Sequence, residues 1–482
     1  MFSYLTQPLS EQRFRAWSII LGHLVFLILL IFSIVFMRER MLHFDAANYA
    51  FSILYYDDYL LPHGRGINVL TQTLPLLWYR LGGSLSSFLL IYSVGFVLIG
   101  YLVYCLVVHG FRSVTGGLYL VLLTILTVRY KFYAPVGEVY QSLTYVGLVA
   151  GWLLRPEDRW QMSHLANTLV AALLVIPLFF THPMGFLSLG AFYVTWLVYS
   201  GRYRFGAYYL LLIAAGLYGA WRYLGEGRLT GYESGRLEAL YEAVDFFSHL
   251  GDYYVWDRFL WYWTTHYHLV GLLFLLALVV LSVRGKWLSA LLCVLATALL
   301  AGLALLLHNY LDAPIYLMLD GYLTHMSVGI GLVITWAFTA RRTRLGLLGL
   351  VVLIGFSVHR IAGVSEYFTR REQVLTGLVT RYQDEGEAKL MAHMSAWDWN
   401  RLWLPWAVGV ETLMMTTLNN PEQPATIYFM PYGQERTDCL EQPDCFLGIH
   451  PAPDRFVLEE LPRYFSFLPQ QPYHRVEAKD AY

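Results

Sequence analysis

The chain has 482 residues, of which 57% are hydrophobic and only 14% are charged, and its mean hydropathy is +0.48. Soluble domains carry about 25% charged residues, so this composition excludes an ordinary soluble protein and indicates a lipid-embedded core. The formal net charge is −1, which provides no global field that favours nucleic acid. We therefore expect an all-α polytopic membrane protein, with membrane lipids and no nucleic acid among its partners.

Apolar stretches of the length that a bilayer requires, roughly 17 to 25 residues per helix, recur along the chain. They predict about eleven transmembrane helices, at residues 16–37, 85–108, 113–128, 139–154, 165–180, 184–199, 205–223, 266–283, 287–307, 322–340 and 345–358. The third, fourth and eleventh of these are short for a span. The first is too long for the apolar region of a signal peptide, so we expect it to remain as a helix.

The basic residues agree with this alternation. With a cytoplasmic start, every inner loop is basic, through Arg13, Arg15, Arg112, Arg155, Arg159, Arg202, Arg204, Arg284, Lys286, Arg341, Arg342 and Arg344. The short outer turns 181–185 and 308–321 carry no Lys or Arg, and only Arg129 and Lys131 break the pattern. The positive-inside rule therefore predicts a cytoplasmic N-terminus and an external C-terminus. Compact loops favour a bacterial inner membrane with a periplasmic C-terminus, although an endoplasmic reticulum placement gives the same topology.

Three outer segments are too long to be turns. They are the first outer loop (38–84) and the large outer loop (224–262), both within a transmembrane domain of residues 1–360, and the extracytoplasmic C-terminal segment 361–482. In this last segment a helical pattern over 364–399 carries charged residues, Arg371 among them, that predict a solvated face. A strand is predicted at 426–432, so we expect a small α+β cap or an irregular tail. Cys439 and Cys445 form a disulfide there if the compartment is oxidising, and are free thiols otherwise.

The first outer loop is the most informative stretch. It begins His43-Phe44-Asp45-Ala46-Ala47-Asn48-Tyr49-Ala50 and continues through Pro62-His63-Gly64-Arg65-Gly66 to Pro75. An acid directly after a first transmembrane helix, followed by an amphipathic segment and a Gly/Pro break, predicts an interfacial element over a cavity and not a plain linker.

This arrangement resembles the GT-C superfamily of membrane glycosyltransferases, in particular the protein O-mannosyltransferases and aminoarabinose transferases. The resemblance rests on Asp45, Tyr49-Ala50 and Pro75, with a Thr-His-Pro turn at 181–185 and the loop 313–316 as further points of similarity. It implies a GT-C-like fold and transfer of a sugar from a polyprenyl-phosphate donor. Asp45 is followed by Ala46 where the family often has a second acid, so a divalent metal is left open and no cofactor is assigned.

The chemistry assigns roles to these residues. Sugar transfer from a lipid phosphate needs a base for the acceptor proton, and cations or hydrogen-bond donors for the departing phosphate. Asp45 is the expected base, and Arg65, Arg129, Lys131 and His182 are the expected donor-phosphate ligands. Three of these residues have a structural alternative: Asp45 as a helix cap, and Arg65 and Lys131 as side chains that snorkel to lipid headgroups.

Other candidates are less specific. Glu138 is either a site residue or a partner of a helix dipole, and Asp57 and Asp58 are a metal pair or surface acids. His63 and His325 are also expected at the outer face, although no metal-ligand spacing links the histidines. No Walker-type loop, Gly-x-Ser-x-Gly elbow or His-Glu-x-x-His run is present.

We therefore expect an inverting glycosyltransferase whose acceptor is an extracytoplasmic glycan, lipid or protein. Two alternatives remain. A transporter or flippase of lipid-linked sugars requires polar residues along a path through the spans, and a non-catalytic scaffold binds a partner through its exported tail. Convergence of the outer acids and bases favours the enzyme, and their dispersal over the surface favours the scaffold.

Overall fold

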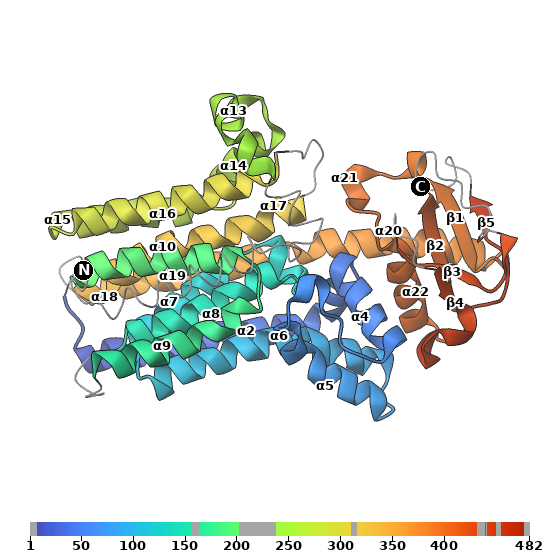
Figure 1. Ribbon diagram of the computed structural model, residues 1–482, viewed down its shortest axis with the longest axis horizontal. Helices are drawn as coiled ribbons and strands as arrows, with labels where there is room; N and C mark the ends of the chain where they lie inside the picture. Colours follow the sequence, from blue (N-terminus) through green and yellow to red (C-terminus); the bar gives the residue numbers. More distant parts are fainter. Residues whose placement is uncertain are drawn as a thin grey trace.

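The computed structural model describes residues 7–156, 163–201, 238–309, 316–430, 439, 441–449 and 455–476. It has two parts, a bundle of roughly aligned helices and a smaller cap at one end of the bundle (Figure 1). The bundle helices are α2 (Glu11–Val35), α6 (Leu85–Cys105), α7 (Val114–Ile125), α8 (Glu138–Leu153), α9 (His164–Phe179), α10 (Met184–Ser200), α15 (His268–Val283), α16 (Trp287–Leu306), α18 (Ser327–Arg341) and α19 (Arg344–Ala362).

Five helices among the described residues are long and apolar enough to cross a bilayer, and a sixth is added if α14 (Tyr254–Thr265) and α15, which meet at 78°, count as one broken span. The expected spans within the described residues all coincide with apolar helices, but those in the middle of the chain are short: α7, α8, α9 and α10 have 12, 16, 16 and 17 residues. A helix of 12 residues is only about 18 Å long. The count of eleven crossings therefore stays a prediction, and the expected span at 205–223 lies outside the described residues.

The early end of α7 is compensated by Arg360 near the end of α19. Its guanidinium donates to the carbonyl oxygens of Ile125 (2.8 Å) and Leu126 (2.6 Å), and to that of His266 (3.2 Å) in the break between α14 and α15. The last carbonyls of a helix have no partner within the helix, and in an apolar bundle such groups are costly unless they are paired. One buried cation thus satisfies two interrupted helices.

Three of the described basic loop residues, Arg284, Lys286 and Arg342, make contacts at the end of the bundle that is remote from the cap (Figure 1). Arg159, Arg202 and Arg204 lie outside the described residues. Arg342 pairs with Glu11 at the start of α2 (2.9 Å), Arg284 donates to Ala340 O (2.9 Å), and Lys286 donates to Tyr199 O (3.3 Å). These contacts connect the start of α2 with the ends of α10, α15 and α18. The grouping of these three residues agrees with the positive-inside pattern, and the orientation of the termini stays a prediction.

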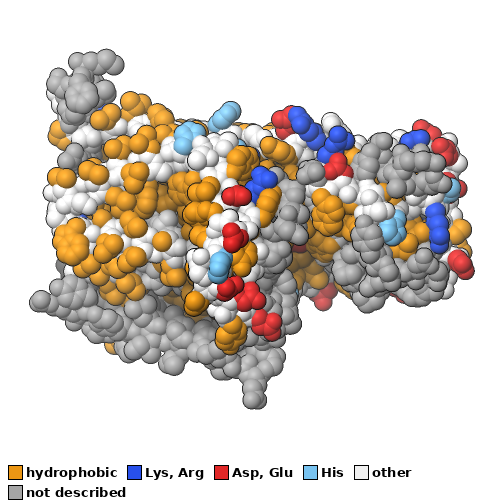
Figure 2. Space-filling model, turned by 90° about the horizontal axis from the view of Figure 1, so that it is seen from above, with side chains coloured by type: hydrophobic (Ala, Val, Ile, Leu, Met, Phe, Trp, Pro, Cys, Tyr) orange, Lys and Arg blue, Asp and Glu red, His pale blue; other side chains and the backbone are white. Residues whose placement is uncertain are grey.

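The elements at the other end of the bundle are short. They are α3 (Met37–Met41), α4 (Phe44–Tyr56), the 3₁₀ turn η1 (Pro62–Gly64), α5 (Asn68–Arg80), η3 (Tyr130–Tyr133), η6 (Ala239–Glu242), α13 (Ala243–Ser248), η7 (Leu250–Asp252), α17 (Tyr316–Leu323) and η8 (Thr324–Met326). The first outer loop is helical and not a plain linker, and Pro75 is buried within α5. Seen from above, apolar side chains cover the bundle, whereas charged side chains gather over the middle of the molecule and the cap (Figure 2).

The C-terminal segment is an α+β cap. Its helices are α20 (Ser365–Gln383), which extends α19 out of the bundle, α21 (Trp399–Leu402) and α22 (Val408–Asn419). A three-stranded parallel sheet has the order β2 (Thr426–Met430), β1 (Lys389–His393), β5 (His474–Val476), and β3 (Cys445–Leu447) pairs antiparallel with β4 (Arg455–Val457). Short 3₁₀ turns, η9 (Met394–Ala396), η10 (Leu458–Glu460) and η11 (Arg463–Phe465), connect these elements.

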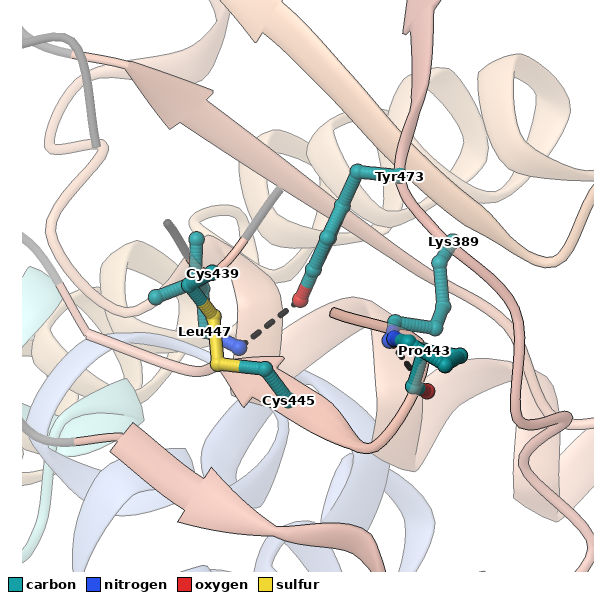
Figure 3. The surroundings of a disulfide bond; sticks show 6 residues. All are labelled: Lys389, Cys439, Pro443, Cys445, Leu447 and Tyr473. Carbon is teal, nitrogen blue, oxygen red and sulfur yellow. Dashed lines mark hydrogen bonds between the residues drawn. A yellow bond between two sulfur atoms is a disulfide. The ribbon is translucent and has the colours of Figure 1, made fainter. Parts of the chain in front are cut away.

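A disulfide joins Cys439 and Cys445 in the cap (Figure 3), as the sequence suggested. Beside it, the Leu447 amide donates to the hydroxyl of Tyr473 (2.7 Å), and the Lys389 ammonium donates to Pro443 O (3.1 Å). Burial lowers the pKa of Lys389 to about 8, and the charge of Asp444 opposes this shift. The disulfide therefore closes the segment that contains Pro443, whose carbonyl oxygen accepts from the buried Lys389.

The cap and the first outer loop share one core. Phe51 of α4 lies 5.0 Å from the ring of Phe456, 5.7 Å from Phe465 and 5.8 Å from Phe446. The charged face predicted for the tail helix is also only partly solvated, because Arg371 is fully buried while Arg370 is exposed. The predicted domain boundary at residue 360 therefore assigns α4 to the transmembrane domain, although α4 packs against the C-terminal segment.

Candidate functional site

Asp45 lies in the first turn of α4, at the cap end of the bundle. Among the described residues, its carboxylate makes no hydrogen bond or ion pair, and its side chain is partly exposed. Burial against the surrounding protein raises the pKa of the Asp45 carboxyl, the charges of Lys131 and Arg65 oppose this, and Glu138 adds to the rise. These three groups come from η3, the α4–α5 connection and α8, so residues far apart in sequence act on one carboxylate.

Lys131 is held by its backbone while its side chain stays uncommitted. The Lys131 amide donates to Asp320 Oδ2 (2.9 Å), and the side chain runs past Gly137 and Gly321. Within the described part of the chain its ammonium has no ion-pair partner, and the residue is only 8% exposed. Burial lowers the pKa of Lys131, whereas the carboxylates of Asp45, Glu138 and Asp320 oppose the shift. Among the described residues, neither the Lys131 ammonium nor the Asp45 carboxylate therefore has a fixed partner, and each charge acts on the pKa of the other group.

Arg65 and Glu138 form a buried ion pair at 2.6 Å, with side chains 6% and 3% exposed. Asn68 at the start of α5 donates to the other carboxylate oxygen of Glu138 (2.8 Å). Glu138 opens α8, where a carboxylate also interacts favourably with the helix dipole. One oxygen of Glu138 is therefore occupied by Arg65 and the other by Asn68, which makes Glu138 a positioning group in this structure and not a free acid.

His182 lies in the turn between α9 and α10 and is buried. Its Nδ1 accepts from the Met184 amide (3.2 Å), so in the neutral ring Nε2–H donates to the Tyr322 hydroxyl (3.1 Å). Burial lowers the pKa of His182 well below its usual value, and the charges of Arg65, His325 and Lys131 act in the same direction. His182 is thus a neutral neighbour of the cluster at pH 7.

The remaining candidates do not join the cluster as free groups. His325 uses both ring nitrogens, one with Ser188 Oγ (2.6 Å) and one with Val139 O (3.0 Å), so it connects three elements of the bundle. Asp57 pairs with Arg80 at 2.9 Å on an exposed surface, and Asp58 Oδ1 accepts from the next amide (2.7 Å). These acids have the structural role that the sequence left open as their alternative.

Arg129 and His63 lie at the edge of the cluster. The Arg129 guanidinium is buried and faces aromatic rings, 4.5 Å from the centroid of Tyr130 and 5.5 Å from that of Trp261. It therefore stands apart from the groups that act on Asp45. His63 is half-buried in η1 with a backbone φ of 54°, and its charge acts on His182.

Sequence reasoning missed Asp320. It is fully buried, and its second oxygen accepts from the Tyr267 hydroxyl (3.2 Å), so it ties the Lys131 loop to α17 and to the start of α15. An acid within an apolar helix is by default a functional candidate, which is the signal that identifies it. Its contacts make it a support for the backbone of Lys131.

Metal binding gains no support from the described residues, which contain no group of three or more His, Cys, Asp or Glu side chains that could hold an ion. Comparison of the chain with protein-family models, with curated proteins and with solved structures yields no match.

Proposed function

We propose that this chain is a GT-C-like membrane glycosyltransferase that moves a sugar from a polyprenyl-phosphate donor to an extracytoplasmic glycan, lipid or protein. The observation that carries the proposal is the placement of an uncommitted carboxylate, Asp45, within electrostatic reach of an uncommitted ammonium, Lys131. Both lie at the end of the bundle opposite the basic loops. By the positive-inside rule this end faces the periplasm of a bacterial inner membrane.

The proposed reaction is a single displacement with inversion. Asp45 takes the proton of an acceptor hydroxyl, the acceptor oxygen bonds to the anomeric carbon, and the bond between that carbon and the phosphate oxygen breaks. A base of raised pKa suits this step because general-base efficiency is highest when the pKa lies near the working pH. Lys131, with Arg65 held in place by Glu138, supplies positive charge for the departing phosphate. His182 offers a neutral ring beside them.

The arrangement favours the enzyme over the two alternatives. A scaffold has no need for acids and bases from α4, η3 and α8 to converge. A flippase needs polar groups along a path through the spans. Among the described residues, the buried charges Asp320 and Arg360 are occupied in binding backbone and hydroxyl groups.

The test is transfer of a radiolabelled sugar from polyprenyl-phosphate donors by purified protein in lipid. We expect Asp45→Asn to lose at least about 100-fold in kcat while it still folds and binds donor. Asp58→Asn is the matched control, since it removes an exposed acid from the same loop, and it should transfer like wild type. Equal activity of Asp45→Asn and wild type would refute the assigned base. If wild type transfers from no donor, the enzyme proposal fails and vesicle flipping assays test the transporter.

A further inference from the structure

A fully buried ion pair lies where the cap meets the bundle. Arg371 on α20 contacts Glu411 on α22 at 2.6 Å, and both side chains are 0% exposed. Arg371 also donates to the carbonyl oxygens of Leu402 (2.8 Å) and Leu404 (3.1 Å). Two charges taken out of water gain little net stability from their attraction, so a pair of this kind points to a requirement for a defined geometry.

Both members of the pair hold the turn that precedes Asp45. Glu411 Oε1 accepts a hydrogen bond from the Phe44 amide (2.6 Å), and the Arg371 guanidinium donates one to His43 Nδ1 (2.8 Å). The Arg371 guanidinium also lies 4.3 Å from the centroid of the Phe44 ring. The cap thus makes polar contacts with both residues directly before Asp45.

Phe44 needs such support. Its φ is +50°, in a region that residues with a side chain rarely adopt, and such a conformation persists only where the surroundings impose it. Because Asp45 follows directly, the backbone of Phe44 sets the direction in which the Asp45 side chain leaves the helix. Release of the Phe44 amide would leave a buried donor unpaired and allow this turn to relax.

We propose that Glu411 and Arg371 are positioning residues that fix the first turn of α4 and so aim the Asp45 carboxylate at the transfer site. The inference rests on the proposed function for its catalytic consequence, but the mechanical part stands on the contacts alone. The cap is then a component of the active site and not a passive appendage. The charged groups that face Asp45 are Lys131, Arg65 and Glu138 from the membrane domain, together with Glu411 from α22.

Three substitutions at one position separate geometry from charge. Glu411→Ala removes the acceptor of the Phe44 amide, and we expect kcat to fall at least about tenfold with little change in the KM for donor. Glu411→Asp keeps the charge but shortens the reach, and should give an intermediate loss. Glu411→Gln keeps an acceptor oxygen but removes a negative charge near Asp45, so kcat is largely retained and the acidic limb of the pH profile moves to lower pH.

Hydrogen exchange provides a readout that does not depend on transfer. Exchange of the amides of residues 43–50 should accelerate in Glu411→Ala and remain at the wild-type rate in Arg463→Ala. The control variant removes contacts of the cap with Tyr79 O (2.7 Å) and Gly83 O (3.1 Å) and leaves the α4 turn intact. If Glu411→Ala does not fold, Glu411→Asp serves for the same comparison.

The outcomes are distinguishable. Wild-type exchange and wild-type kcat in a folded Glu411→Ala protein would overturn the inference. Equal losses in Glu411→Ala and Arg463→Ala, with no pH shift in Glu411→Gln, would also overturn it, because a general weakening of the cap would then suffice. If wild type transfers no sugar but exchange accelerates only in the Glu411 variants, the proposed function fails while the positioning of the α4 turn holds.

Discussion

Gly137→Ala offers a direct test of Lys131, because this position controls the lysine without carrying any chemistry of its own. Gly137 caps the start of α8 with φ −68° and ψ 120°, which alanine adopts without strain. A methyl group there would lie 2.8 Å from Lys131 Cε and closer still to Nζ. Carbon and nitrogen atoms pack at about 3.5 Å, so the ammonium must move by roughly 1 Å or more.

Misplacement of a catalytic group by about 1 Å costs on the order of 100-fold in rate, so we expect kcat/KM of Gly137→Ala to fall by about that factor in the sugar-transfer assay. The stability cost should be about 1 kcal/mol, because alanine is a poorer N-cap than glycine, and the displaced atoms add little since they end a flexible side chain. Melting temperature and transfer rate should therefore respond very differently.

Two further alanines calibrate the effect. A methyl group at Gly321 would lie 3.3 Å from Lys131 Cδ, whereas one at Gly190 on α10 would meet open space. The expected order of loss in transfer is Gly137→Ala, then Gly321→Ala, with Gly190→Ala close to wild type. A folded Gly137→Ala protein that transfers sugar as fast as wild type would refute the role of the Lys131 ammonium.

The remaining predictions concern the cap. Burial lowers the pKa of Lys389 to about 8, so above that pH the folded cap binds fewer protons than the unfolded chain. The stability of the cap should therefore rise between about pH 8 and 10, by up to about 3 kcal/mol. Thermal unfolding of Lys389→Met should lack this dependence on pH, and an identical dependence would contradict the assignment. Replacing Cys439 and Cys445 by serine opens a loop whose ends are 6 positions apart, which should destabilise the cap by about 2 kcal/mol. Reductant should lower the melting temperature of wild type and leave the serine variant unchanged, and a shift in both would point to another cause.

Much of the fold could be predicted because its signals are local. The length of an apolar run predicts a helix without knowledge of its neighbours, and the expected spans within the described residues coincide with helices. The first outer loop was predicted to be more than a plain linker, and it is helical. The paired cysteines predicted the bridge. Asp45, Arg65, Lys131 and Glu138 also proved to be electrostatic neighbours. The positive-inside rule had already predicted that their loops lie on the same side of the membrane.

The tertiary structure decided which of these residues are free to act. Arg65 and Glu138 are 73 positions apart, and nothing local distinguishes a glutamate committed to a buried arginine from one available as an acid.

Arg371 illustrates the same limit more strongly. It follows Arg370 on a charged helix, and only the packing of α22 and α4 makes one of the two solvated and the other fully buried. The sequence by itself predicted the helices, a sidedness and a set of candidate residues. Long-range packing alone decided which charges are paired, because burial and partner choice depend on contacts between segments that are distant in the chain.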